Sequence, residues 1–247
     1  IAAVPADSVV QDCLVGLNWI LVRSDRGLGI AMQPHRMPGS PRSYRPIAGM
    51  KTRDLAKWSK SWDFLDAAIG LAAINSVLND RKPVEGWCGR ALDTLPDINF
   101  FEDVPDDFKG RKVAVVGHFY GLESLAQSCT LSVLERLPRD GDLPDPACEY
   151  ILPEQDIVIM TATTLINKTM PRLLQLSRNA RVIVCGPTTP LTPLMFGHGV
   201  DMLAGFVVTD HKAAWLAVQE GAERELLAVA GSRMVQITAP PRADITR

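Results

Sequence analysis

The first eighty residues of the chain alternate between apolar runs and polar turns and then change to a helical period. Two apolar runs, 13–22 and 29–33, are separated by the polar turn 24–27, and this arrangement predicts an antiparallel hairpin. From residue 61 to residue 78 the apolar positions recur every three or four residues, which predicts a helix with Ser61 as its N-cap. We therefore expect a small α+β unit in which one long helix covers the hairpin.

Beyond residue 111 the apolar positions form short, continuous, β-branched runs. Three of these runs are typical of strands buried on both faces: 112–117, 156–161 and 181–186. The same alternation predicts a fourth strand and three helical segments: strand 204–208 and helices 121–129, 170–177 and 211–230. Strands and helices that alternate in this way form a doubly wound, Rossmann-like domain with a parallel sheet.

A proline-containing stretch with six acidic and no basic residues, 93–107, separates the two patterns and is typical of a domain linker. We predict an α+β domain over 1–92, an acidic linker over 93–111 and a Rossmann-like domain over 112–247. The last residues, 239–247, are expected to form a loose tail.

Composition and charge exclude several classes of protein. Lys and Arg number 26 against 28 Asp and Glu, so nothing in the overall charge favours binding to nucleic acid or to an anionic membrane. The stretch 182–200 lacks charge but contains three prolines, and it cannot form a membrane-spanning helix. Five scattered cysteines indicate reduced thiols and a cytoplasmic location. We expect a small-molecule partner; a homodimer stays open.

Three predicted strands end in unusual polar loops: 117–121 (GHFYG), 161–169 (TATTLINKT) and 186–193 (GPTTPLTP). Ligands of open parallel sheets bind beyond the carboxyl ends of the strands, where loops and free backbone N–H groups meet. Because all three loops follow strands of one predicted sheet, we expect them to form one ligand site.

His118 directly follows a predicted strand and faces the expected site. An imidazole there suits general acid-base catalysis, metal ligation or a plain hydrogen bond to loop backbone. The sequence contains no C-x-x-C, H-E-x-x-H or H-x-x-x-H spacing, which argues against a preformed structural zinc site.

Glu135 follows Gly117 by 18 residues, at the end of a predicted strand over 131–134. This is roughly the offset of ~20 residues at which an acid binds ribose hydroxyls in dinucleotide-binding domains. Phe119, however, replaces the second glycine of the dinucleotide fingerprint and disfavours NAD. A nucleoside-type cofactor such as S-adenosylmethionine remains an alternative, and so does a solvated acid at a strand end.

Other polar residues allow two readings each. The threonines and Asn167 before the helix at 170–177 suit an anionic ligand, or they cap the helix. The prolines of 186–193 stiffen a loop that either positions a ligand or forms a wall. Asn75, inside an apolar helix, either bonds to neighbouring backbone or faces a polar cleft. Seven bases in 36–60 favour anions or form a solvated face.

Several motifs resemble a known family: VAVVGHF at 113–119, the Glu135 region with GDLP at 141–144, LPEQDIVIMTATTLINKT at 152–169, VCGPTTPLTP at 184–193 and GVDMLAG at 199–205. They are similar to the "putative heavy-metal chelation" domain family, long catalogued as a domain of unknown function. The first part of the chain, with LAAINSVLN at 71–79, is similar to the companion domain that precedes it in the family, whose fold resembles the N-terminal domain of enolase.

The resemblance implies an active site in the cleft between an enolase N-terminal-like domain and the Rossmann-like domain. The residues of the matching motifs are then candidates for ligand binding: Asn75, Gly117, His118, Glu135, Thr163, Thr164, Asn167, Gly186, Pro187, Thr188 and Pro190. His118 is the candidate for a catalytic group or a metal ligand. We expect a two-domain protein that binds a small anionic or metal-chelating ligand in this cleft, with a transition-metal ion bound directly or through a small chelator; catalysis on that ligand stays open.

Overall fold

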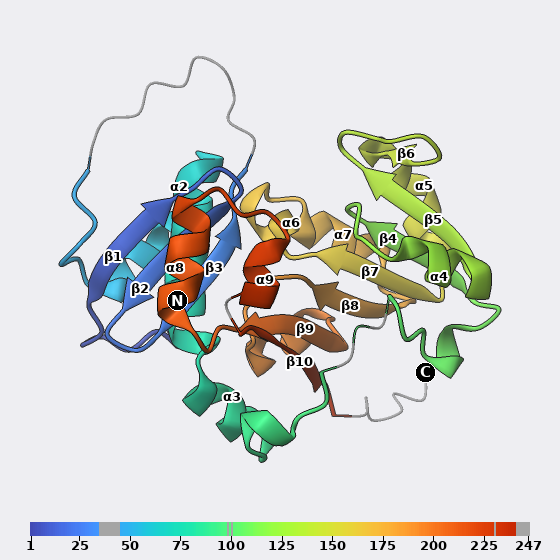
Figure 1. The fold of residues 1–247 in the computed structure, drawn as a ribbon. Coiled ribbons are helices and arrows are strands. Elements are labelled where there is room, and N and C mark those ends of the chain that lie inside the picture. The colour runs from blue at the N-terminus through green and yellow to red at the C-terminus, as the bar shows by residue number, and fades with distance from the viewer. Residues whose placement is uncertain (35–44, 98, 100, 230, 241–247) are drawn as a thin grey trace.

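The chain forms two sheets that lie beside each other in Figure 1. The structure is a computed structural model that describes residues 1–34, 45–97, 99, 101–229 and 231–240. The smaller sheet is antiparallel and comes from the start of the chain, whereas the larger is mostly parallel and comes from the second half. The predicted mixed α/β class is confirmed. Most of the predicted tail, 241–247, lies outside the described residues.

The small sheet has three antiparallel strands in chain order: β1 (Val10–Val15), β2 (Trp19–Ser24) and β3 (Leu28–Met32). The polar turn 24–27 joins β2 to β3, as expected. The apolar run 13–22 is not one strand, because a second turn divides it where the Gly16 N–H donates to the Trp19 carbonyl at 2.9 Å. Hydrophobicity alone does not reveal this turn, since apolar Leu17 lies inside it.

Three helices follow the small sheet: α1 (Thr52–Ala56), α2 (Phe64–Leu78) and α3 (Arg81–Cys88). The predicted end of α2 at Leu78 is confirmed, but its N-cap is Asp63 and not Ser61. The Asp63 carboxylate accepts the N–H groups of Leu65 and Asp66, whereas the Ser61 hydroxyl accepts only the Asp63 N–H.

Two helices from opposite ends of the chain cover the small sheet. On one face Ile20, Val22 and Ala31 pack against α2. The other face packs against α8 (His211–Gln219), which crosses in front of the sheet in Figure 1. The small sheet therefore completes its core with a helix from the second half of the chain.

The large sheet has seven strands: β4 (Lys112–Val116), β5 (Thr130–Glu135), β6 (Leu143–Pro144), β7 (Ile157–Thr161), β8 (Arg181–Cys185), β9 (Met202–Val207) and β10 (Arg233–Thr238). Their spatial order is β10-β9-β8-β7-β4-β5-β6. Every neighbouring pair is parallel except β9 and β10. This is the order of a dinucleotide-binding domain with one antiparallel strand added at the edge.

The predicted strands 112–117, 156–161 and 181–186 match β4, β7 and β8 to within one residue at each end. Connecting helices are α4 (Leu122–Ser128), α5 (Cys148–Ile151), α6 (Thr163–Ile166), α7 (Met170–Leu176) and α9 (Glu225–Val229). Alternate residues of the central strands enter apolar clusters on opposite faces of the sheet, which explains their continuous hydrophobicity. None of the described helices is long and apolar enough to cross a bilayer.

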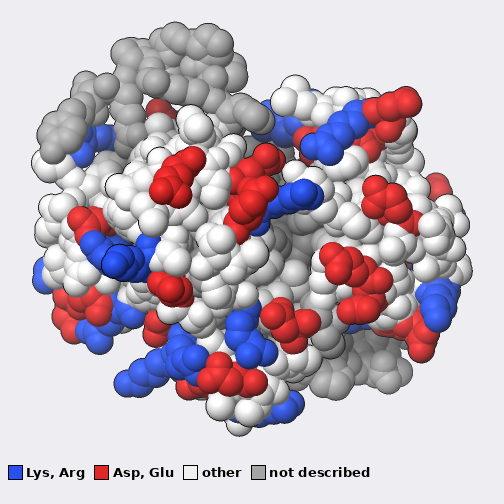
Figure 2. Space-filling view, in the orientation of Figure 1, with Lys and Arg blue, Asp and Glu red and all other residues white. Residues whose placement is uncertain are grey.

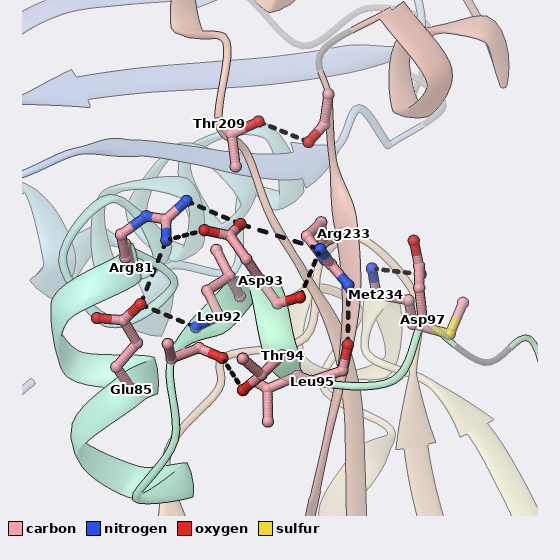
Figure 3. A network of polar contacts seen from close by, with 12 residues as sticks. Arg81, Glu85, Leu92, Asp93, Thr94, Leu95, Asp97, Thr209, Arg233 and Met234 are labelled. Carbon is pink, nitrogen blue, oxygen red and sulfur yellow. Dashed lines mark hydrogen bonds and ion pairs between the residues drawn. The ribbon is translucent and has the colours of Figure 1, made fainter.

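The acidic segment has ordered contacts with the edge strand β10, as Figure 3 shows. The Asp93 carboxylate accepts from the Arg81 guanidinium, and Arg233 donates to the Leu95 carbonyl at 2.8 Å. Farther along, Phe101 and Phe108 are buried in the core of the large sheet. Much of this segment therefore packs as part of the second unit, although its composition is typical of a linker.

Candidate functional site

The order in which the chain adds strands to the large sheet reverses at β4. The chain continues to β5 on one side and later to β7 on the other, so the carboxyl ends of β4 and β7 form a topological switch point. Gly117 follows β4 with φ near 100°, and a Cβ at this position would lie 2.8 Å from Thr161 Cγ2 at the end of β7. The loops after these two strands thus contact each other, as the sequence predicts.

The Phe119 ring lies against the loops at this edge of the sheet. Its ring carbons would be 3.7 Å from a Cβ at either Gly117 or Gly186, and it stacks on Phe101 with the ring centroids 4.9 Å apart. Gly186 begins the loop after β8, so one aromatic ring brings the ends of β4 and β8 together. The ring occupies space through which a pyrophosphate would approach the backbone of a typical dinucleotide-binding domain.

His118 is oriented by a buried carboxylate. Its Nδ1 lies 3.0 Å from Asp142 Oδ2, and the Asp142 side chain is 4% exposed. Burial alone would raise the pKa of Asp142, but the bonds from the Arg139 N–H and from His118 outweigh burial and lower the pKa below 3.8. An ionised carboxylate only accepts, so Nδ1 carries a proton, and in the neutral form of this imidazole the lone pair is on Nε2.

Glu135 fixes the backbone on which His118 lies. Its carboxylate accepts the N–H groups of His118 at 2.9 Å and Arg136 at 2.6 Å, and more weakly that of Leu137. The acid at the end of β5 thus holds the loop after β4 in place. These bonds run to the protein's own backbone, and the ligand contact expected of Glu135 from sequence stays a prediction.

The hydroxyls after β7 are largely satisfied within their own loop. The Thr163 N–H and hydroxyl both contact Thr161 Oγ1, and Thr164 Oγ1 donates to the Thr161 carbonyl at 2.6 Å. Asn167 Oδ1 accepts from the N–H and hydroxyl of Thr169. Among the described residues nothing accepts from Asn167 Nδ2, so this half-buried amide keeps a free donor.

The loop after β8 joins the two units. Thr188 is buried; its Oγ1 accepts the Met32 N–H at 2.9 Å, and its carbonyl accepts from Asn75 Nδ2 at 3.0 Å. One turn further along α2, Asn79 donates to the Thr189 carbonyl and accepts the Leu191 N–H, both at 2.8 Å. Asn75 thus bonds to backbone, that of Ile30 and of Thr188, which is the first of its two alternatives; its expected role in ligand binding, like that of Thr188, stays a prediction.

Of the other candidates in this loop, Pro187 lies between Gly186 and the buried Thr188 and is partly exposed. Pro190 lines a cavity of about 240 Å³ between α2 and the segments after β7 and β8. A shallower hollow lies at the opposite end of the strands, around Asn179 and Asp201, away from all the predicted residues.

Two buried cysteines, Cys148 and Cys185, are held as neutral thiols at neutral pH in the metal-free protein. Burial raises the pKa of Cys148 to about 12, and burial also raises the pKa of Cys185, which ends β8 beside the site. Within the part of the chain that the structure describes, no three His, Cys, Asp or Glu side chains are grouped to hold a metal ion.

The basic run 36–60 is partly neutralised. Arg36 and Arg42 lie outside the described residues, whereas Arg45 pairs with Asp66 and stacks on Trp58 with its guanidinium 4.0 Å from the ring centroid. Figure 2 shows basic and acidic side chains interspersed on the face in view, with no broad patch of one sign. In the described part of the run Lys57 also pairs with Asp54, and the two alternatives for the run stay predictions.

Asp142 is the site residue that sequence reasoning missed. It lies 24 residues after His118, in the loop before β6, and only its place in the GDLP motif singled it out. The sequence offers one signal for such a pair: a histidine at the end of one strand and an acid after the neighbouring strand. Several acids meet that description, among them Glu135 and Asp140, so the signal does not identify Asp142.

The buried Asp142 carboxylate predicts a specific pH dependence. A carboxyl whose pKa falls on folding stabilises the fold at pH values above its unfolded pKa of 3.8, and this contribution disappears as the pH falls through the folded pKa. The free energy of unfolding of the native chain should therefore fall more steeply than that of Asp142→Asn between about pH 5 and pH 3. Urea titrations at several pH values measure this; parallel curves for the two proteins would contradict it.

The comparisons with known proteins agree with this fold. Residues 100–236 match the DUF364 family model and residues 1–78 match the DUF4213 model, both described as "Putative heavy-metal chelation". A crystal structure of a DUF364 protein of unknown function from Desulfitobacterium hafniense is 36% identical and has a TM-score of 0.83, covering 96% of this chain and 94% of the other.

Two further relatives come from archaea. A DUF364 structure of unknown function from Pyrococcus horikoshii shares the fold at 22% identity, with a TM-score of 0.76 and 94% of each chain covered. An uncharacterized protein of Methanocaldococcus jannaschii is 29% identical over 213 residues, which are 81% of this chain and 78% of the relative. The two matches leave residues 79–99 between them; this stretch contains α3 and the first part of the acidic segment, and the rest of that segment belongs to the DUF364 match.

Proposed function

Since the chain belongs to the DUF364 family, whose description supports a role in metal chelation, we propose that it binds a small metal-chelating anion at the carboxyl edge of the large sheet, between the two units. The observation that carries this proposal is His118, whose Nδ1 is bound to the buried Asp142 carboxylate and whose Nε2 has no partner within the part of the chain that the structure describes. A histidine that ligates a metal almost always donates its other ring N–H in this way.

The remaining donors near His118 suit a chelate better than a bare ion. The imidazole supplies one nitrogen ligand, and the nearby Thr161 and Thr163 hydroxyls are neutral and bonded to each other. A first-row transition metal generally takes four or more ligands, so a polydentate small molecule would supply most of them. In this proposal the carboxylate of that molecule accepts from Asn167 Nδ2, in the loop after β7, which has no acceptor among the described residues. In this proposal the metal ion arrives with the chelating molecule and is not a resident cofactor of the protein. The His118 imidazole is also suited to transfer a proton to the bound ligand.

Isothermal titration calorimetry with Zn²⁺–citrate, Zn²⁺ alone and citrate alone tests the proposal. We expect saturable binding of Zn²⁺–citrate that is tighter than binding of either component. Asn167→Ala should weaken it by about tenfold, the value of one hydrogen bond to a charged group. Asn179→Ala removes an exposed amide from another loop and is the matched control. Absence of Zn²⁺–citrate binding, or equal affinities for Asn167→Ala and the native chain, would overturn the proposal.

A nucleoside-type cofactor is the competing function, and two observations speak against it. Glu135 already accepts three backbone N–H groups, and the Phe119 ring lies against the glycines of the switch point. A thermal-shift panel with S-adenosylmethionine, NAD and ATP separates the two functions, because a ligand at 100 times its Kd stabilises a fold by about 2.7 kcal/mol. A shift with one of these compounds and none with Zn²⁺–citrate would favour the competitor.

A further inference from the structure

The 240 Å³ cavity beside α2 is distinct from the group around His118. One wall is a stripe of α2 that contains Leu71, Ile74 and Leu78, at helical spacing. The facing wall contains Leu165 of α6 and Met195, which lies in the 3₁₀ helix η6 (Pro193–His198). Neither His118 nor Asn167 lines it. The cavity is thus an apolar space between the two units.

This cavity is large enough for a small organic molecule. A buried apolar cavity of about 150 Å³ binds benzene, and this one is larger and open to solvent on one side. Leu194 at its edge is 61% exposed, so its side chain is accessible to a molecule bound in the cavity. The polar lining groups are few: Ser59, Thr192 and His198. A pocket with apolar walls and a few polar groups is the usual form of a small-molecule site.

A cationic side chain, that of Lys168, contacts two residues of the cavity wall without lining the cavity itself. The Lys168 ammonium donates to the carbonyls of Ser59 and Leu165, and both of these residues line the cavity. Among the described residues no carboxylate pairs with Lys168, so one of its three N–H donors is free. Desolvation lowers the pKa of this ammonium, as expected for a cation without a counter-charge.

The backbone at Lys168 is also unusual. Its φ of 68° is the only positive φ of a non-glycine residue in the described part of the chain. A side chain other than that of glycine pays a steric cost in this region, and such residues cluster at ligand sites. The strained backbone directs the Lys168 side chain to the η1 helix (Lys57–Lys60), whose Ser59 borders the cavity.

We propose that this cavity binds a small carboxylic acid with a hydrocarbon body, with the hydrocarbon between α2 and η6 and the carboxylate toward Lys168. The apolar walls bury the hydrocarbon, and the free ammonium donor accounts for the anionic end. The walls come from both units, so the bound acid would also hold the two units together. This site is independent of the proposed chelate site, because the two share no side chain that binds ligand.

Calorimetry with octanoate, and with 1-octanol as its neutral counterpart, tests this site. The native chain should bind one octanoate per chain. Leu194→Asp, at the exposed edge, should weaken octanoate binding at least tenfold by repulsion. Leu216→Asp on α8, where the leucine is 51% exposed away from the cavity, should leave it unchanged. Lys168→Met should weaken octanoate binding at least tenfold and leave 1-octanol binding within twofold.

Failure of this inference is distinguishable from failure of the proposed function. No saturable octanoate binding by the native chain, or equal binding by Leu194→Asp and Leu216→Asp, would overturn the cavity proposal whatever Zn²⁺–citrate does. His118→Ala should bind octanoate as the native chain does. If Lys168→Met does not fold, as judged by circular dichroism, the Leu194→Asp comparison decides, because it changes only an exposed side chain.

Discussion

Replacing Gly29 with alanine is expected to lower the free energy of unfolding by about 4 kcal/mol, a large part of the stability of a typical domain. A Cβ at residue 29 would lie 2.0 Å from the Ala72 carbonyl oxygen and 2.2 Å from the Ser76 nitrogen. Both atoms are backbone of α2, so no side chain can rotate away and the helix must shift from β3. Urea denaturation followed by circular dichroism measures the loss.

Gly86→Ala is the matched control for Gly29→Ala. Residue 86 lies inside α3, and a Cβ there would meet nothing within 4 Å. Alanine is about 1 kcal/mol better than glycine inside a helix, so this variant should be slightly more stable than the native chain. A Gly29→Ala chain that keeps its stability to within 1 kcal/mol would contradict the close packing of β3 on α2.

The second large effect is expected at His118. His118→Ala removes the one imidazole that the described residues place at the switch point. It should weaken binding of Zn²⁺–citrate at least 100-fold, because the metal ion loses its nitrogen ligand from the protein. His211→Ala, at the start of α8, removes a histidine elsewhere and should leave the affinity within twofold. Calorimetry measures both. Equal affinities for His118→Ala and the native chain would show that the chelate, if bound, does not use this imidazole.

Asp142→Asn keeps the His118 imidazole but changes the side chain that orients it, so this variant tests the orientation alone. Asp142 Oδ2 accepts the Arg139 N–H and also lies nearest to His118 Nδ1. The amide is neutral and has one oxygen instead of two, so it holds the Nδ1–H tautomer less firmly and admits the tautomer with the proton on Nε2. That second tautomer has no lone pair for a metal ion on Nε2, so affinity should fall about 10- to 100-fold. Asp140→Asn removes the same charge from an exposed position in the same loop, and it should change little.

The central strands were predictable because the large sheet buries them on both faces. The runs at β4, β7 and β8 have no polar interruption, so their ends are visible in the sequence. The edge strand β10 was not predicted, because it alternates apolar and polar residues over a short stretch. The turn between β1 and β2 is not visible in the sequence, because apolar Leu17 lies in it and the hydrophobic run appears continuous.

The candidate site was predictable in place but not in its internal bonds. Parallel strand ends bring the loops around Gly117 and Thr161 together whatever their side chains do. The choice of Asp142 as the partner of His118 depends on the path of the loop before β6, which no local pattern encodes. The role of Asn75 likewise depends on how α2 docks on the loop after β8, and helical periodicity cannot show docking across units.

The most direct test of the chelate site is anomalous X-ray diffraction at the zinc edge from crystals grown with Zn²⁺–citrate. We predict a zinc peak about 2.0–2.1 Å from His118 Nε2, with Nδ1 still bound to Asp142. A zinc peak at other residues, or no ordered zinc in crystals of a chain that binds Zn²⁺–citrate in solution, would contradict the assignment of His118 as the metal ligand.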